Sequence, residues 1–291
     1  MASWVLSLLG HERISRAAGG PLALPDVWWP LLGSLIAAPG LSLSRGALAG
    51  RIWPDKDEYS ARHCLATALW RIRSRLPADQ GLLRFDGETV RLALSRFDFV
   101  DVLVFERRAR AALRDVERLS IVRERRRLAR ALACYRGAFL QERDQEAIAL
   151  ERERLRTLYL DALFALAEAE TAAGDWPAAR AAAQSLCAVE PLREDAQRLL
   201  MTAHVRCGSR ALALSQYRRL EQFLASELGI GPMTETRALA ERIGAGEPAP
   251  APAPAPATAQ ASDPADPARE AMLLVRRRLE TSIRIIDAAL A

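Results

Sequence analysis

The chain has 291 residues, half of them hydrophobic, which is enough for two domains that each bury their own core. Its 41 basic and 36 acidic residues give a net charge of +5. Residues 1–96 hold 12 basic and 8 acidic side chains, so most of the excess lies in the first third. A basic local surface suits a polyanion such as nucleic acid, because neutralised phosphates release counterions.

The sequence gives no sign of secretion or of a membrane span. The first residues lack the basic segment of a signal peptide, and the longest uncharged stretch, residues 27–43, is interrupted by two prolines and two glycines. The cysteines form no C-x-x-C pair, which favours a reduced protein: Cys64, Cys134, Cys187 and Cys207. We therefore expect a cytoplasmic protein that does not enter a membrane.

The first ninety-odd residues mix short strands with helices. WVLSLLG predicts a strand from about residue 4, and a second short strand is expected near residues 20–24. A helix is expected to start near Pro25 and to end at Pro39–Gly40. LSRGALAGRIW predicts the next helix, with Ser44 as its N-cap.

The third predicted helix, YSARHCLATALWRIRSRLP at residues 59–77, has two contrasting faces. One is an apolar stripe at helical spacing that requires a core: Leu65, Leu69, Ile72 and Leu76. The opposite face is polar and aromatic, with arginines at its edges: Arg62, His63, Thr67, Trp70, Arg71, Arg73 and Ser74. Such a face either meets solvent or lies in a groove of DNA.

Beyond Pro77, alternating apolar residues on both sides of Asp86–Gly87 predict a hairpin, since this dipeptide supplies the positive φ of a tight turn. Strands, three helices and a hairpin in this order are the plan of a winged helix-turn-helix. In that fold the third helix enters the major groove and the hairpin wing lies along the DNA backbone. We assign this domain to residues 1–96.

From Phe97 to about Gly246 the pattern becomes wholly helical. Two segments repeat at an offset of 34 residues, the tetratricopeptide (TPR) period, in which Gly174 corresponds to Gly208. The predicted fold is thus mostly α, with an N-terminal α+β winged helix-turn-helix and an all-α TPR-like domain at residues 97–246. Residues 247–268, rich in proline and alanine, predict an extended linker, and residues 269–291 an amphipathic helix.

The order of these parts resembles the bacterial transcriptional activators of the Streptomyces antibiotic regulatory protein (SARP) type, over about residues 4–244. The most specific pieces are SARHCLATALWRIRSRL, VDV followed by FE at residues 100–106, and ELGIGP at residues 227–232. The resemblance implies a TPR-like bacterial transcriptional activator domain behind the winged helix. It also implies a regulator that binds promoter DNA as a side-by-side pair and recruits RNA polymerase. His63 and Trp70 depart from many relatives, which affects the base sequence recognised and not the class of protein.

Eight residues are candidates for contacts with double-stranded DNA. Four on the third helix suit base edges: Arg62, His63, Thr67 and Trp70. Four suit phosphates, two on the helix and two on the wing: Arg71, Arg73, Arg84 and Arg91. The alternative for each is an ordinary solvated side chain. Trp70 could also pack against the wing or a neighbouring subunit, and His63 could bond locally.

The remaining motifs do not indicate chemistry. The arginines of SIVRERRRLARALACYRG, with Arg123, Arg127 and Arg130 at helical spacing, are interpreted as a solvated face and not as a second DNA contact. His204 and Cys207 stand at i and i+3, but no second pair completes a metal site. The sequence has no phosphate-binding loop and no nucleophile elbow, so we expect neither an enzyme nor a cofactor.

Two functions follow. The first is a sequence-specific transcriptional regulator, by resemblance an activator, whose repeats form a homodimer or contact RNA polymerase. The second is a TPR-type scaffold with a degenerate winged helix that does not bind DNA. Residues 62–75 favour the first, because they carry four arginines and no acid stands between Glu58 and Asp79.

Overall fold

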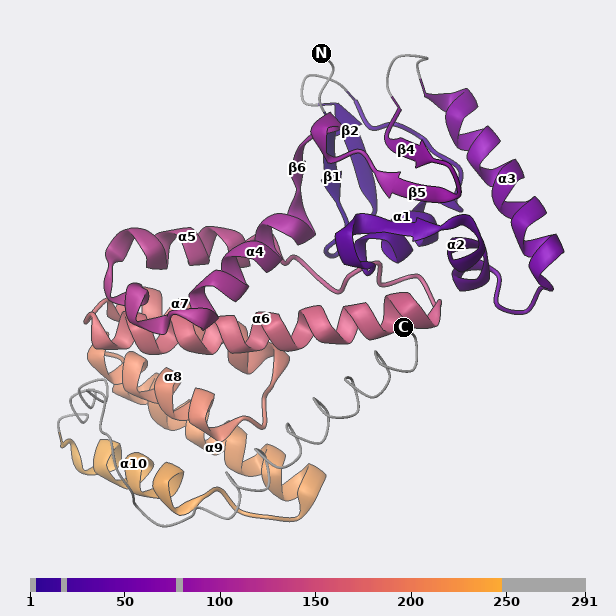
Figure 1. The fold of residues 1–291 in the computed structure, drawn as a ribbon. Coiled ribbons are helices and arrows are strands. Elements are labelled where there is room, and N and C mark those ends of the chain that lie inside the picture. Colours follow the sequence, from indigo (N-terminus) through magenta and orange to yellow (C-terminus); the bar gives the residue numbers. More distant parts are fainter. Residues whose placement is uncertain (1–3, 17–19, 77–80, 248–291) are drawn as a thin grey trace, which may run out of the picture. The chain divides into compact units, whose positions relative to one another are not determined.

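The computed structural model describes residues 4–16, 20–76 and 81–247, and it is mostly helical, as the sequence predicts (Figure 1). The expected linker lies outside these ranges except for residue 247, and the expected C-terminal helix lies wholly outside them. In chain order the elements are β1 (Trp4–Ser7), β2 (Arg13–Arg16), α1 (Trp28–Ile36), β3 (Ser42–Ser44), α2 (Arg45–Ile52), α3 (Glu58–Arg75), β4 (Leu83–Asp86), β5 (Thr89–Leu92), β6 (Phe97–Val100), α4 (Asp101–Arg114), α5 (Val122–Leu132), α6 (Glu146–Ala172), α7 (Trp176–Val189), α8 (Glu194–Arg206), α9 (Arg210–Leu228) and α10 (Thr234–Ala245), with short 3-10 turns at Pro39–Leu41, Leu94–Arg96 and Val116–Ser120.

The first sheet has the order β2-β1-β6, with β1 antiparallel to β2 and parallel to β6. It corrects two expectations. The second strand is β2 and not residues 20–24, where Pro21 has no N–H for a ladder and forms only an isolated bridge with Ser15. The wholly helical pattern was wrong for Phe97–Val100, whose aromatic and β-branched residues form β6 beside β1.

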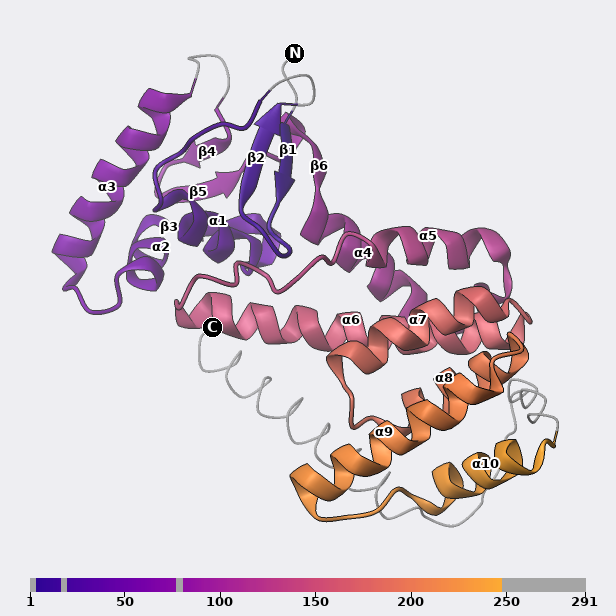
Figure 2. The same ribbon diagram turned by 180° about the vertical axis from the view of Figure 1, so that it is seen from behind.

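The second sheet has the antiparallel order β3-β5-β4 and contains the wing. The predicted turn is confirmed, because Gly87 has a φ of +56° between β4 and β5. The predicted cap of α2 is confirmed as well, since Ser44 Oγ accepts a hydrogen bond of 3.1 Å from the N–H of Ala47. Helix α3 lies beyond α2 and beside the wing, at the outer edge of this region (Figures 1 and 2).

The helical repeats show the predicted offset of 34 residues. Gly174 lies in the turn after α6 with a φ of +74°, and Gly208 lies in the turn after α8 with a φ of +78°. Glycine adopts this conformation without a steric penalty. Ala179 on α7 and Ala213 on α9, at the same offset, are both buried. The two pairs α6–α7 and α8–α9 therefore form successive TPR-like units, and α10 packs against α8 and α9.

The segment between α5 and α6 returns to the end of β1. The N–H of Leu140 donates to the carbonyl of Leu8 at 3.0 Å, and the N–H of Gly10 donates to the carbonyl of Ala138 at 3.1 Å. A Cβ on Gly137 would lie 2.7 Å from the Cα of Gly10, so the two backbones touch without room for a side chain. This backbone contact joins the winged helix to the repeats.

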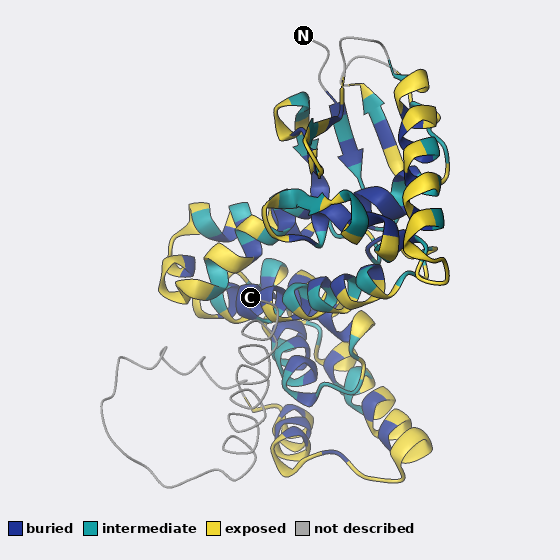
Figure 3. Cartoon of the chain, turned by 45° about the vertical axis from the view of Figure 1, so that its right-hand side comes forward, coloured by how far each residue is buried: buried dark blue, intermediate teal, exposed yellow. Residues whose placement is uncertain are grey.

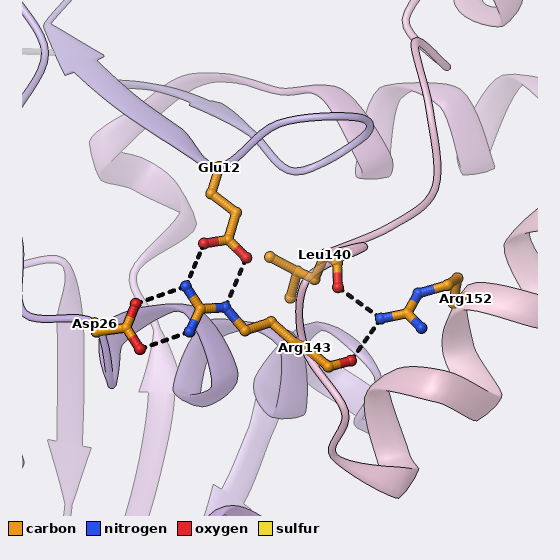
Figure 4. A network of polar contacts seen from close by, with 5 residues as sticks. All are labelled: Glu12, Asp26, Leu140, Arg143 and Arg152. Carbon is orange, nitrogen blue, oxygen red and sulfur yellow. Dashed lines mark hydrogen bonds and ion pairs between the residues drawn. The ribbon is translucent and has the colours of Figure 1, made fainter.

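Polar groups reinforce the same junction (Figure 4). The Arg143 guanidinium donates two hydrogen bonds to Glu12, at 2.8 and 2.6 Å, and two to Asp26, at 2.6 and 2.7 Å. Arg152 on α6 holds the loop from the other side, donating to the carbonyls of Leu140 and Arg143 at 2.6 Å each. Arg143 thus ties the loop before α6 to both the β1–β2 turn and the approach to α1.

Asp101, the first residue of α4, secures the end of β1. Its buried carboxylate accepts hydrogen bonds from the N–H groups of Leu8 and Leu9 at 2.9 to 3.0 Å and from that of Val102 at 2.7 Å. Burial raises the pKa of the Asp101 carboxyl, and the three N–H groups oppose that shift. A single hydrophobic core extends from Trp4 in β1 as far as α8, so the junction is buried and continuous.

Helix α5 only partly fits the predicted solvated face. Arg123 and Arg130 are exposed, as expected for such a face, while Arg127 is half-buried and pairs with Glu124 at 2.6 Å. Arg125, a neighbour that the pattern did not distinguish, is buried and pairs with Glu170 of α6 at 2.7 Å. The arginine-rich segment therefore supplies an internal ion pair as well as a surface.

Candidate nucleic-acid interface

The core-facing side of α3 is the predicted apolar stripe. Leu65, Leu69 and Ile72 are buried, and Leu76 is half-buried as the C-cap residue. Asp57 caps the N-terminus, because its carboxylate accepts a hydrogen bond of 3.0 Å from the N–H of Ser60. The stripe fixes α3 on the domain and turns its other side outward (Figure 3).

The outward side of α3 presents the predicted polar and aromatic residues. Its exposed members are Arg62, His63, Trp70, Arg71, Arg73, Ser74 and Arg75. Trp70 is 69% exposed, so in this structure its indole does not pack into the wing. Thr67 is half-buried. The outward side of α3 is therefore an exposed surface that consists mainly of large polar and aromatic side chains.

Arg62 is less free than the sequence indicates. Its guanidinium lies 2.9 Å from the carboxylate of Glu58 on the same helix and 3.6 Å from that of Glu88 in the wing turn. The count of acids along the helix could not reveal Glu88, which the fold brings in from the hairpin. Exposed pairs of this kind contribute about 0–1 kcal/mol, so a phosphate or a base edge can replace the carboxylates.

The two wing arginines face each other across the hairpin. Arg84 on β4 and Arg91 on β5 are directly opposed in the strand register, and both are exposed. Arg84 also donates a hydrogen bond of 3.2 Å to Ser95 Oγ. Like charges directly opposite on a sheet repel each other. This side of the wing is therefore favourable for an anion.

The structure adds two residues that the sequence analysis missed, Arg45 and Phe85. Arg45 begins α2 and Phe85 lies in β4, and the guanidinium of Arg45 is 5.7 Å from the centre of the Phe85 ring. Arg73 of α3 lies 5.4 Å from the same ring. The Ser44 cap indicates that residue 45 lies in the first turn of α2, but only the fold places it between α3 and the wing.

The His204 and Cys207 pair is not completed into a metal site among the described residues. Within the described ranges, no three side chains among His, Cys, Asp and Glu come close enough together to hold a metal ion. His204 is buried in the repeats, where burial lowers its pKa. Over the same ranges we find no helix whose length and hydropathy suit a membrane span.

Comparison with known proteins decides the family. Residues 100–244 match the family model of the bacterial transcriptional activator domain. The chain is also 29% identical over 218 residues to the regulatory protein AfsR of Streptomyces griseus, a match that covers 73% of this chain and 22% of AfsR. The chain belongs to the SARP-type transcriptional regulators.

This SARP-type regulator has further relatives in mycobacteria. It is 37% identical over 119 residues to the transcriptional regulatory protein EmbR of Mycobacterium tuberculosis, covering 40% of this chain and 31% of EmbR. A solved structure of M. tuberculosis EmbR in complex with a low-affinity phosphopeptide superposes with a TM-score of 0.66 at 25% identity. That superposition covers 86% of this chain and 67% of the EmbR chain. The curated relatives are longer, and the matches span 22% to 31% of their length.

Proposed function

We propose that this regulator binds promoter DNA in a sequence-specific manner and acts as a transcriptional activator in the cytoplasm. In this proposal residues 1–96 read the DNA, with α3 in the major groove and the β4–β5 wing along the backbone. Residues 97–246 form a homodimer or contact RNA polymerase, and no step of catalysis is involved. The kinship with regulatory proteins supports the proposal.

The observation that carries the proposal is the outer face of α3. It exposes four arginines together with His63 and Trp70, while its opposite side is buried in the core. In a duplex these side chains would meet base edges through Arg62, His63, Thr67 and Trp70, and phosphates through Arg71, Arg73 and the two wing arginines. A scaffold with a degenerate winged helix has no physical need for such a face.

The test is binding to genomic DNA fragments over a salt series, with the wild type beside Arg71→Gln and the double variant Arg62→Ala with Arg71→Ala. We expect the wild type to retain a few fragments at physiological salt. We expect Arg71→Gln to weaken binding uniformly and the double variant to lose the selected fragments. Arg123→Gln, which removes the same charge from an exposed position on α5, serves as the control.

If the wild type binds no fragment more tightly than the non-specific range, a Kd of about 10⁻⁴ to 10⁻⁶ M, the regulator hypothesis fails and the scaffold hypothesis takes its place. Sedimentation of the full chain tests the homodimer separately, because a monomer at micromolar concentration contradicts that part alone.

A further inference from the structure

The groove between α3 and the wing contains two arginines without an acidic partner. Arg45 and Arg73 approach the Phe85 ring at 5.7 and 5.4 Å, and within the described residues neither forms an ion pair. Cation–π contact holds both guanidinium groups in place but does not neutralise them. Two fixed cations on one ring favour a shared counter-anion.

The hydrogen bonds of Arg45 show which part of it lacks a partner. Its backbone N–H donates to the carbonyl of Glu88 at 2.8 Å, and Ser44 caps the helix that it begins. Its Nε is buried and has no hydrogen-bond partner within the described residues. A buried donor without an acceptor is destabilising, so a ligand that supplies an acceptor there is favoured.

The space beside these arginines can accommodate such an acceptor. A cavity of about 400 Å³ is bordered by Arg45, Trp70, Arg73, Ser74 and Phe85. An adjoining cavity of about 160 Å³ is lined by Arg62 and Glu88 among others. The groove is thus neutralised at its Arg62 end and positively charged at its Arg73 end.

We infer that the Arg73 end of this groove is an anion site that takes one phosphodiester of the DNA backbone, held jointly by Arg45 and Arg73. The inference rests on the proposed function and specifies how the duplex is seated between the recognition helix and the wing. A phosphodiester fits because guanidinium groups bind its two free oxygens in a fixed geometry. Trp70, on the rim of the same cavity, then lies beside the sugar or base next to that phosphate.

The experiment uses a labelled duplex that the full-length wild type selects from a random-sequence pool. Binding is measured between about 50 and 200 mM salt for Arg45→Gln, Arg73→Gln, the double variant and Arg45→Lys, with Arg123→Gln as the control. One lost phosphate contact lowers the magnitude of the slope of log K against log salt by about 0.9. The factor by which the affinity falls between about 50 and 200 mM salt then becomes about 3.5 times smaller.

We expect each glutamine variant to show this change, and the double variant to show no more than either single variant, because one phosphate is shared. The control keeps the wild-type slope, and Arg45→Lys keeps most of it. An unchanged slope for Arg45→Gln, or single effects that add in the double variant, overturns the shared site. A wild type that selects no duplex is instead a failure of the proposed function.

A second measurement needs no Arg45 variant, so it tests the site even if Arg45→Gln fails to fold. Neutral methylphosphonate groups are placed one at a time along the selected duplex. One position should weaken the wild type and leave Arg73→Gln unaffected, and the lack of any such position contradicts the inference. Inorganic phosphate provides the last arm. If it raises the Tm of the wild type but not of Arg45→Gln while the salt slopes are equal, the site takes a free anion and not DNA.

Discussion

The Arg143 contacts at the junction give a prediction of defined size. Arg143→Met removes the two hydrogen bonds to Glu12, whose side chain is only 15% exposed, and the two to Asp26, whose side chain is 81% exposed. A hydrogen bond to a charged group contributes about 1.5–3 kcal/mol, and an exposed ion pair about 0–1 kcal/mol. We therefore expect a loss of about 2–4 kcal/mol in the free energy of unfolding, nearly all of it through Glu12.

Thermal and urea unfolding of the full chain measure this loss. At about 2–4 °C per kcal/mol for a chain of this size, Arg143→Met should lower the Tm by roughly 5–15 °C. Asp26→Asn should lower it by less than about 4 °C, because its pair is exposed. Arg136 is an exposed arginine of the same loop, so Arg136→Met is the matched control and should have the Tm of the wild type.

The effect of pH follows from the same ion pair. The hydrogen bonds from Arg143 hold the pKa of Asp26 below its ordinary value of 3.8. A depressed folded-state pKa adds stability above the unfolded pKa and loses it as pH falls through the folded pKa. The gap between wild type and Asp26→Asn should therefore close below about pH 3.8. An Asp26→Asn loss as large as that of Arg143→Met, or a double-mutant cycle of Glu12 and Arg143 without coupling, would refute the reasoning.

Four further substitutions test other parts of the fold by thermal or urea unfolding. Asp101→Asn should cost about 1–3 kcal/mol, because the amide group would point an N–H at the backbone donors at the end of β1; an unchanged Tm would contradict this role. Burial lowers the pKa of His204, so the wild type should lose stability as pH falls below 6.5, and His204→Gln should lose less; parallel curves would disprove the assignment. Gly10→Ala should destabilise strongly, because its φ is +90° and a Cβ would lie 2.8 Å from the facing backbone. Gly50→Ala, in a helix with open space around it, should be neutral or stabilising by up to about 1 kcal/mol, and equal effects of the two would refute the close approach.

The local parts of the fold were predictable because their signals are short in range. Leu65, Leu69 and Ile72 define the buried side of α3 by spacing alone, Asp86–Gly87 defines the wing turn, and Gly174 with Gly208 defines the repeat. The strand at residues 97–100 was missed because it is held by parallel pairing with β1, more than ninety residues away. Propensity within a window does not report such pairing.

The same limit applies to the candidate site, of which only the part on a single helix was predictable. A helix face can be read from periodicity, so the exposed side of α3 was correctly identified, although its role in DNA binding stays a prediction. Arg45, Phe85 and Glu88 reach that face from α2 and the hairpin, and no spacing rule connects them to it. The electrostatic character of the groove is a property of the tertiary fold.

The contact between Gly10 and Gly137 bears on how such regulators can be recombined. The loop before α6 follows α4 and α5 in sequence but contacts the end of β1 in space, through its bonds to Leu8 and Gly10. A chimaera that joins residues 1–96 to a foreign helical array would leave the end of β1 without these bonds and would place Gly10 against a surface that does not fit it. The portable unit is the winged helix together with β6, the start of α4 and this loop, so exchange of DNA specificity between relatives requires two crossovers and not one.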